Sequence, residues 1–320
     1  MSIYVNAGLD ETARARLALG LPDRPLRWAS PVATMLVAGG ADEALRDATI
    51  VFGQPDPMSL LGAKQLKLVQ LSSAGWARYD RQDLRAAFAR RGTALCSASS
   101  VFADPVADHA LAMILSLLRR LPEAEDEQRG DRRWLFTELR AGSRLLSGET
   151  VLLLGYGAIA QKIAARLRPF GCKIVGYRRR PRGDEEIPVV DHAGLGAALA
   201  GADHVVDLLP EGAATHHFVD AAFLSQCKRG SRFYNLGRGD TVDQGPLIEA
   251  LRSGRLDAAF LDVTTPEPLP PTDPLWTTPR LFLTPHTAGG HLGEQRRTVD
   301  HFLSNLAAFE AGRALADRVY

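Results

Sequence analysis

A glycine-rich turn near the middle of the 320-residue chain constrains its fold most strongly. The apolar run Val151–Leu154 leads into the turn Gly155–Ala160 (GYGAIA), and the helix-like stretch Gln161–Arg168 follows. This order of strand, G-x-G-x-x-A turn and helix predicts a dinucleotide site, with the pyrophosphate at the helix N-terminus. The alternative is a glycine turn with a purely structural role. The cofactor contacts expected on the turn are Gly155, Tyr156, Gly157, Ala158 and Ile159.

Three arginines follow the next predicted strand, Lys173–Tyr177. They are Arg178, Arg179 and Arg180, and no carboxylate appears before Asp184. An NAD site carries Asp or Glu about 20 residues past the turn, whereas guanidinium groups suit the 2′-phosphate of NADP. We therefore expect NADP(H) as the cofactor, with NAD less favoured; the alternative is a solvated basic loop.

Short apolar runs alternate with longer amphipathic stretches on both sides of the turn. This alternation predicts an α/β fold with two parallel-sheet domains. The apolar segment Pro105–Leu118, with Asp104 as its N-cap, predicts a buried helix at or near a subunit interface. The expected strands are Ile3–Asn6, Ala48–Gly53, Leu66–Leu71, Ala94–Ser97, Val151–Leu154, Lys173–Tyr177, His204–Leu208, Arg232–Leu236, Ala258–Asp262 and Leu281–Thr284.

The composition disfavours several other classes of protein. Lys and Arg number 38 against 37 Asp and Glu, a balance that disfavours a nucleic-acid binder. Three cysteines without a C-x-x-C pair predict neither a disulfide framework nor a zinc site, and His216 and His217 lack further ligands in sequence, so no metal is expected. No run of 18 apolar residues and no signal segment is visible, so we expect a cytoplasmic protein without a membrane span.

Five motifs give the chain a resemblance to a known family: Gly155–Ala160, Asn235–Gly239, Leu261–Val263, Glu267-Pro268 and Thr284–His286. In order and spacing they resemble the D-isomer-specific 2-hydroxyacid dehydrogenases, especially the NADP-dependent glyoxylate/hydroxypyruvate reductases. The resemblance implies a Rossmann domain (residues 100–288) inserted in a flavodoxin-like substrate domain (residues 1–99 and 289–320). It also implies a homodimer that acts on a small 2-oxo acid or 2-hydroxy acid.

Reduction of a 2-oxo acid requires a proton donor for the forming alkoxide and a cation for the carboxylate. His286 ends an apolar strand and can donate the proton, since imidazole titrates near neutrality. Arg238, in a glycine-flanked loop after another strand, can bind the carboxylate and polarise the carbonyl. Glu267 would orient His286 and favour its protonated form.

The resemblance implies further contacts with the cofactor and with the substrate. Asp262 would meet the nicotinamide end of the cofactor, and Leu209 and Pro210 keep the pattern of the cofactor loop. The backbone N–H groups of Ala74 and Gly75 would bind the substrate carboxylate beside Trp76. We therefore expect an NADPH-dependent reductase of glyoxylate or hydroxypyruvate; the alternatives are an NAD-linked D-2-hydroxyacid dehydrogenase and a dinucleotide-sensing, corepressor-like protein.

Overall fold

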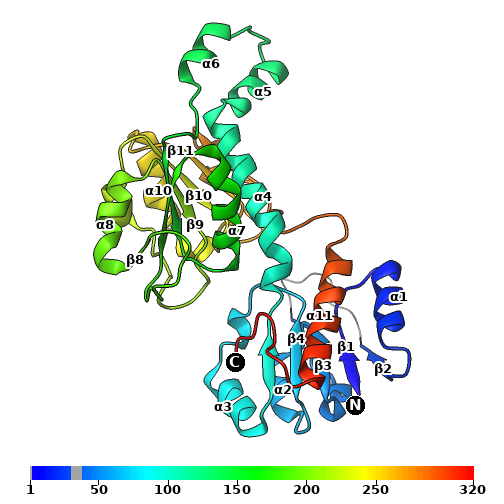
Figure 1. The fold of residues 1–320 in the computed structure, drawn as a ribbon. Helices are drawn as coiled ribbons and strands as arrows, with labels where there is room; N and C mark the ends of the chain where they lie inside the picture. Colours follow the sequence, from blue (N-terminus) through cyan, green and yellow to red (C-terminus); the bar gives the residue numbers. More distant parts are fainter. Residues whose placement is uncertain (1, 30–37) are drawn as a thin grey trace. The chain divides into compact units, whose positions relative to one another are not determined.

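The computed structural model describes residues 2–29 and 38–320 as two compact units (Figure 1). The first unit contains residues 1–102 and 290–320, and the second contains residues 103–289. Each unit is built on one sheet whose strands all run parallel. The predicted α/β class with two parallel sheets is confirmed.

The first unit holds a five-stranded sheet with helices on both faces. Two separate apolar clusters cover its faces: Phe52 stacks on Phe302 in one, and Val69 packs with Phe88 in the other. The C-terminal helix thus returns to the sheet made by the N-terminal segment. In sheet order the strands are β2 (Leu26–Trp28), β1 (Ile3–Val5), β3 (Ile50–Gly53), β4 (Leu68–Leu71) and β5 (Ala94–Cys96), and the helices are α1 (Glu11–Gly20), α2 (Pro57–Gly62), α3 (Gln82–Arg91) and α11 (Glu294–Glu310).

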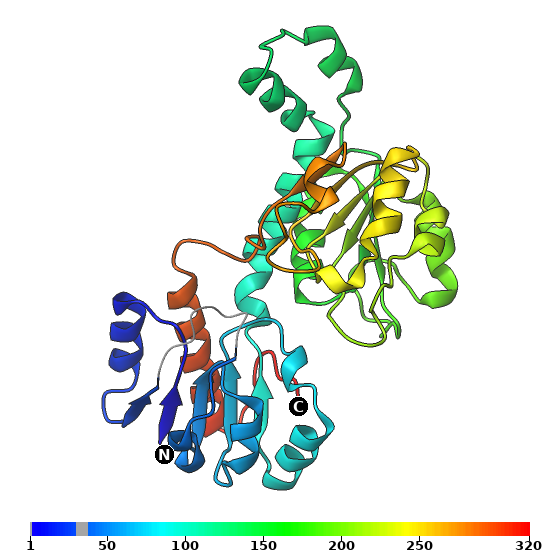
Figure 2. The same ribbon diagram turned by 180° about the vertical axis from the view of Figure 1, so that it is seen from behind.

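The second unit holds a seven-stranded sheet, again covered on both faces, as Figures 1 and 2 show from opposite sides. In sheet order the strands are β12 (Leu281–Leu283), β11 (Leu256–Leu261), β10 (Ser231–Asn235), β9 (His204–Asp207), β6 (Thr150–Leu154), β7 (Lys173–Tyr177) and β8 (Val189–Val190). Its helices are α4 (Ser99–Leu118, which begins in the first unit), α5 (Leu121–Arg129), α6 (Phe136–Gly142), α7 (Ala158–Leu167), α8 (His192–Gly201), α9 (Ala221–Gln226) and α10 (Gln244–Arg252).

The strand order of the second unit indicates where on its sheet a ligand would bind. The chain runs from β6 to β7 on one side and then crosses to β9 on the other, so the winding direction reverses between β6 and β9. In doubly wound sheets, ligands bind at the carboxyl ends of the strands on either side of such a reversal. The glycine turn leaves the carboxyl end of β6, at this reversal.

Helix α4 differs from its prediction. It begins at Ser99, so Pro105 and Asp104 lie inside it, and the predicted N-cap at Asp104 is wrong. Instead of capping, the Asp104 carboxylate pairs with Arg166 at 3.0 Å and with Lys162 at 3.4 Å. The helix extends toward the N-terminus because Val101 and Phe102 are themselves buried, which local capping signals do not reveal.

The apolar character of α4 is largely used inside its own unit. Met113, Ile114 and Leu117 are buried in the core against α7 and the sheet. By length and composition alone this helix could cross a membrane, but 56% of its most apolar window is buried in the structure. Core helices pass the same test, and packing against the sheet accounts for this one.

Two short strands were not expected from the sequence. β2 is an edge strand with exposed Arg27 and Trp28, and β8 has only two residues. Neither contains an apolar run long enough to give a periodic signal, so only pairing with β1 and β7 defines them.

Candidate active site

The glycine turn has the geometry of a pyrophosphate cradle. Gly155 has φ of +89°, and a Cβ there would lie 3.2 Å from the carbonyl oxygen of Leu208. Gly157 is the N-cap of α7, makes no side-chain capping bond, and faces open space where its Cβ would be. The first N–H groups of α7 therefore remain available for an anion, and the turn fits a dinucleotide.

The remaining predicted residues of the turn divide between the core and the ligand edge. Tyr156 is buried in the core cluster that also contains Ala160. Ala158 and Ile159 form the first helical turn of α7 and are only partly buried. Their backbone N–H groups lie in the first turn of the helix, where an anionic ligand would bind.

Arg178 follows β7 but already has a carboxylate partner. Its Nη1 lies 3.0 Å from Oε1 of Glu185, a side chain that is only 7% exposed. The backbone N–H groups of Arg182 and Gly183 also donate to Glu185, and with these bonds the pKa of Glu185 falls to about 2. Glu185 therefore holds together the two ends of the loop 178–185.

Arg179 and Arg180 are the exposed members of the arginine triplet. Within the described part of the chain, neither forms an ion pair. Their guanidinium groups are thus available for an external anion, while that of Arg178 is partly neutralised.

The loop after β9 carries the predicted cofactor residues Leu209 and Pro210. Leu209 is buried, and its N–H donates to the carboxylate of Asp207 at 2.9 Å. The preceding carbonyl, of Leu208, is the atom that approaches Gly155. This loop and the glycine turn therefore lie against each other at the reversal point of the sheet.

Arg238 follows β10, and its backbone is held tightly. Its carbonyl oxygen accepts bonds from Asn235 Nδ2 at 2.9 Å and Thr241 Oγ1 at 2.6 Å. Its Nη1 donates to the carbonyl of Gly237, and no carboxylate among residues 2–29 and 38–320 forms an ion pair with it. Burial lowers the pKa of Arg238. A desolvated guanidinium without a carboxylate partner is suited to bind an anionic ligand.

His286 and Glu267 are brought together from two neighbouring strands. His286 Nδ1 lies 2.8 Å from Glu267 Oε2, and the N–H of Thr264 donates to Oε1 of the same carboxylate. Burial raises the pKa of Glu267, but the bonds from His286 and Thr264 outweigh it, and the charges of His286 and Arg238 add to the lowering. Glu267 is therefore a carboxylate that orients the imidazole and leaves Nε2 for a substrate.

His286 is also held in an unusual backbone conformation. Its φ is +54°, and its N–H donates to the carbonyl of Asp262 at 2.8 Å. A non-glycine residue in the left-handed region is strained, and such strain is typical of functional positions.

Asp262 is buried and supports the segment that carries His286. Its carboxylate accepts bonds from the N–H groups of Thr287 and Ala288 and from the hydroxyl of Thr284. His109 Nε2 lies 3.2 Å from the same hydroxyl, whose proton already goes to Asp262, so His109 donates here. These bonds define a structural role for Asp262, and its predicted contact with nicotinamide stays a prediction.

Ala74, Gly75 and Trp76 lie in the first unit, on the loop after β4. Ser73 Oγ donates to the carbonyl of Gly75, and Gln54 Nε2 donates to Ser73 Oγ, so the loop is braced by side chains. No described residue accepts from the N–H of Ala74 or Gly75. Trp76 packs on the core of this unit, with the Arg85 guanidinium 5.7 Å from its ring centroid.

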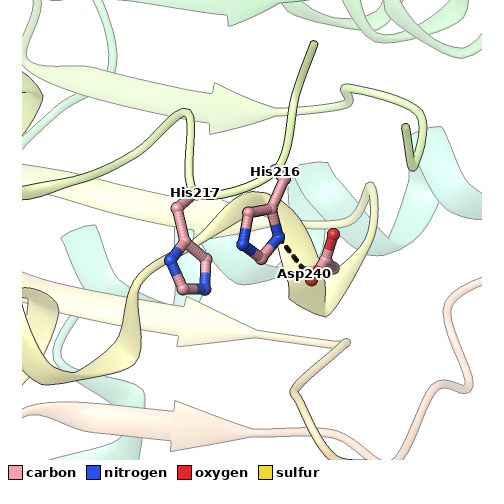
Figure 3. A group of neighbouring side chains, drawn as sticks. All are labelled: His216, His217 and Asp240. Atoms are coloured by element: carbon pink, nitrogen blue, oxygen red, sulfur yellow. Dashed lines mark hydrogen bonds and ion pairs between the residues drawn. The ribbon is translucent and has the colours of Figure 1, made fainter. Parts of the chain in front are cut away.

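His216 and His217 lie next to Asp240, a contact that the sequence did not reveal. Asp240, 24 positions beyond His216, accepts from its Nδ1 at 2.8 Å (Figure 3). The two imidazoles are stacked, with centroids 4.0 Å apart and planes inclined by 19°. Ring nitrogens bind a metal along lone pairs in the ring plane, so these nearly parallel rings do not point at one ion.

Three residues of this edge were missed by the sequence analysis: Asp207, Glu185 and Asp240. Each is a carboxylate whose bonding partner is distant in sequence, either on another loop or seven positions away on the same loop. Asp207 could have been singled out, because it is a charged residue at the end of a strongly apolar strand. The other two gave no local signal.

Comparison with known proteins identifies the family to which this fold belongs. Residues 111–288 match the family model described as D-isomer specific 2-hydroxyacid dehydrogenase, NAD binding domain. The glyoxylate reductase/hydroxypyruvate reductase of Mus musculus is 35% identical over 221 residues, which cover 68% of this chain and 66% of that protein.

Among the solved structures that resemble this chain over nearly its whole length are two enzymes in complex with NADPH or NADP. The D-isomer specific 2-hydroxyacid dehydrogenase of Xanthobacter autotrophicus Py2, in complex with NADPH and MES, has a TM-score of 0.82 and 27% identity, covering 100% of this chain and 98% of that chain. The NADPH-dependent glyoxylate/hydroxypyruvate reductase of Sinorhizobium meliloti, in complex with NADP and malonate, has a TM-score of 0.74 and 28% identity, covering 99% and 96%.

The doubly wound sheet and its glycine turn define a dinucleotide-binding oxidoreductase fold. The chain belongs to the D-isomer specific 2-hydroxyacid dehydrogenase family, because the matched model spans more than half of it. The protein is accordingly an NAD(P)-dependent enzyme of this family, as the sequence motifs predicted.

Proposed function

We propose that this enzyme uses NADPH to reduce glyoxylate or hydroxypyruvate to the corresponding 2-hydroxy acid. The observation that carries the proposal is the pairing of His286 with Glu267 at 2.8 Å, next to an Arg238 without a carboxylate partner. The similar enzymes of Mus musculus and Sinorhizobium meliloti support the choice of substrates.

The residues divide the chemistry among them. When bound, the nicotinamide supplies a hydride to the keto carbon. Arg238 holds the substrate carboxylate and polarises the carbonyl, since its guanidinium offers several donors in one plane. His286 gives the proton at Nε2 to the developing alkoxide, and Glu267 keeps the ring in place from the Nδ1 side.

The choice of NADPH rests on the loop that follows β7. Arg179 and Arg180 offer exposed guanidinium groups where an NAD-specific protein would carry a carboxylate. The carboxylate that does lie there, Glu185, is turned inward onto Arg178 and two backbone N–H groups. It is therefore not free to accept from a ribose 2′-hydroxyl.

An initial-rate panel tests the proposal. The wild-type enzyme is assayed with glyoxylate, hydroxypyruvate, pyruvate and larger 2-oxo acids, each with NADPH and with NADH. We expect the highest kcat/KM for one of the two small substrates with NADPH. A preference for NADH, or for a bulky 2-oxo acid, would overturn the cofactor or the substrate assignment respectively.

Substitution of His286 tests the assignment of the proton donor. We expect His286→Ala to lower kcat by ~10²–10⁴-fold, the usual contribution of general acid catalysis, with little change in NADPH binding. His217→Ala is the control, because His217 is exposed and bonds to no catalytic residue through its side chain. A His286→Ala enzyme with wild-type kcat would refute the assignment.

We also propose that the enzyme is a homodimer whose subunits meet through the segment α5–α6. Figure 1 shows this segment projecting from its sheet, and neither helix has a buried residue. Trp134 is 93% exposed and Phe136 is 61% exposed beside a groove of about 790 Å³. The groove is bordered by both acidic and basic residues, Glu127 and Arg140 among them, which suits a surface that pairs with a copy of itself.

A reducing cytoplasm is the compartment that we propose for the enzyme. Its three cysteines are all free thiols. Cys96 and Cys227 are buried, and burial raises the pKa of each thiol to about 12, so both are protonated and poorly reactive. Cell fractionation tests the assignment, and recovery of the enzyme outside the cytoplasmic fraction would overturn it.

A further inference from the structure

Asp207 is a fully buried acid at the carboxyl end of β9. Its neighbours in the sheet are Leu154 on β6 and Asn235 on β10. Its Oδ1 accepts the N–H of Leu209, and its Oδ2 lies 2.5 Å from the hydroxyl of Thr241. No role has been given to Asp207 in the chemistry described above, although it touches both loops that carry that chemistry.

The hydroxyl of Thr241 has two oxygen neighbours at hydrogen-bond distance. It lies 2.5 Å from Asp207 Oδ2 and 2.6 Å from the carbonyl oxygen of Arg238. A hydroxyl has one proton to donate, and a carbonyl oxygen has none. If Asp207 were ionised, one of these two contacts would bring two oxygens together without a proton between them. A second proton, on Asp207, satisfies both.

We propose that Asp207 is a neutral carboxylic acid that positions the Arg238 loop. Its Oδ2–H donates to Thr241 Oγ1, and the Thr241 hydroxyl donates to the carbonyl of Arg238. Through Oδ1 the same acid holds the N–H of Leu209. One side chain thereby ties the cofactor loop to the loop of the substrate-binding arginine, a role that rests on the function proposed for Arg238.

The surroundings of Asp207 favour the neutral form. Burial raises its pKa to about 7, against the opposing effect of the bonds from Thr241 and Leu209. The charged groups on the adjoining elements are engaged elsewhere: Arg238 Nη1 donates to Gly237, and Asp240 accepts from His216.

The other titratable groups on β9 and β10 are engaged away from Asp207. Tyr234, one position before Asn235, has its hydroxyl 3.0 Å from His204 Nδ1. His204 and Arg232 form a register pair three positions before Asp207 and Asn235. Both lie against Glu149, with His204 Nε2 2.6 Å from its carboxylate. Among the residues that the structure describes, no cationic side chain therefore replaces the missing hydration of an Asp207 carboxylate.

The decisive comparison is between Asp207→Asn and Asp207→Ala. An asparagine amide can donate to Thr241 and accept from Leu209, as the protonated acid does, whereas alanine can do neither. We expect Asp207→Asn to keep kcat/KM for glyoxylate with NADPH within about threefold of the wild type near pH 6. Asp207→Ala and Thr241→Val should each lose about 10-fold or more, mostly in KM, as expected when buried hydrogen-bond partners are removed.

The pH dependence separates positioning from a purely structural role. The ratio of kcat/KM in Asp207→Asn to that in the wild type should rise as the pH passes about 7, where the wild-type acid ionises. Taking the ratio cancels every titration that the two enzymes share. A ratio that is constant from pH 6 to pH 9 would overturn the proposal.

Infrared spectroscopy gives a readout that does not depend on activity. The carbonyl stretch of a protonated carboxylic acid should be present in the wild type at pH 5.5, absent in Asp207→Asn, and retained in the exposed control Asp184→Asn. If the band is missing from the wild type, or if Asp207→Asn loses activity as alanine does, Asp207 is ionised and the proposal is wrong. An enzyme that shows the band but reduces neither substrate contradicts the proposed function alone.

Discussion

The imidazole of His286 is oriented by a carboxylate that remains ionised. The bonds and charges around Glu267 outweigh the effect of burial, so its pKa lies below the usual value of 4.5. Glu267 is therefore negatively charged at every pH suitable for an assay, and its Oε2 accepts a bond from Nδ1 of the imidazole.

Replacement of Glu267 should move the pH profile of the reaction. In Glu267→Gln the negative charge next to His286 is lost, so the alkaline limb of kcat/KM for reduction should shift to lower pH by about one unit. Initial rates from pH 5.5 to 9.5 measure the limb. Glu249→Gln, an exposed change on α10, is the matched control and should leave it in place. An unmoved limb in Glu267→Gln would show that the two side chains are not coupled.

Arg178 shows that the residue type alone does not reveal which groups a side chain contacts. The sequence predicts three arginines at the expected site of the cofactor's adenosine end, and only the structure shows that Glu185 forms an ion pair with one of them, Arg178. Because Glu185 also accepts from two backbone N–H groups, it fixes the loop from which Arg179 and Arg180 project.

Glu185 and its neighbour Asp184 give a matched pair of substitutions. Both Glu185→Ala and Asp184→Asn remove one negative charge, but only the first removes the bonds that close the loop. We expect Glu185→Ala to weaken the binding of 2′,5′-ADP by about 3- to 30-fold, and that of 5′-AMP little, by titration calorimetry. Asp184→Asn should bind 2′,5′-ADP slightly more tightly. Tighter binding in both variants would mean that Glu185 acts only by its charge.

Among the elements, the turn that follows β10 has little room for an added side chain. Gly239 begins a 3₁₀ turn, Gly239–Thr241, and a Cβ on it would lie 2.0 Å from the carbonyl oxygen of Thr264. The contact is with backbone, which cannot move aside as a flexible side chain could. Gly239 is required because the Thr264 backbone lies so close. Its φ is outside the left-handed region and would allow other residues.

The substitution Gly239→Ala should therefore affect stability and catalysis together. We expect it to lower the free energy of unfolding by about 1–3 kcal/mol, the usual cost of overpacking, and to raise KM for the 2-oxo acid as Arg238 is displaced. Urea denaturation and initial rates measure the two effects. Gly201→Ala, at the end of α8 with open space around it, is the control and should not destabilise the protein. Equal stability of the two variants would contradict the packing argument.

At the scale of the whole molecule, the exposed apolar side chains that could form a subunit interface lie on α5–α6 and not on α4, where the sequence predicted an interface. The long apolar helix α4 was expected at or near an interface, but its apolar residues largely fill the core of its own unit. The exposed apolar side chains Trp134 and Phe136 belong to the adjoining segment α5–α6, whose two helices have no buried residue. The prediction of a homodimer thus rests on a different element from the one first considered.

Sedimentation tests the homodimer. We expect the wild type to sediment as a dimer at micromolar concentration, and Trp134→Asp combined with Phe136→Asp to shift it to a monomer, because buried aromatic residues dominate interface energies. Leu19→Asp, a change of equally exposed apolar surface on α1 of the first unit, should leave the dimer intact. A monomeric wild type, or a dimer that resists the double substitution, would contradict the assignment to α5–α6.

The sequence by itself determined the class of fold and the residue types of the candidate site. Mostly apolar runs of four to six residues located ten strands, because strands covered on both faces need nearly continuous apolar sequence. The glycine turn, Arg238 and His286 were found because each begins within two positions of the end of such a run, and the carboxyl ends of parallel strands share one edge.

Only the tertiary structure decided how those residues are paired. The contacts Glu267–His286, Glu185–Arg178 and Asp207–Thr241 span 19, 7 and 34 positions, and no periodicity reports contacts between loops. The start of α4 at Ser99 and the pairing of β2 and β8 were likewise set by packing. Local sequence encodes the conformation of a segment, whereas protonation and ion pairing depend on desolvation and neighbours that exist only after the chain has folded.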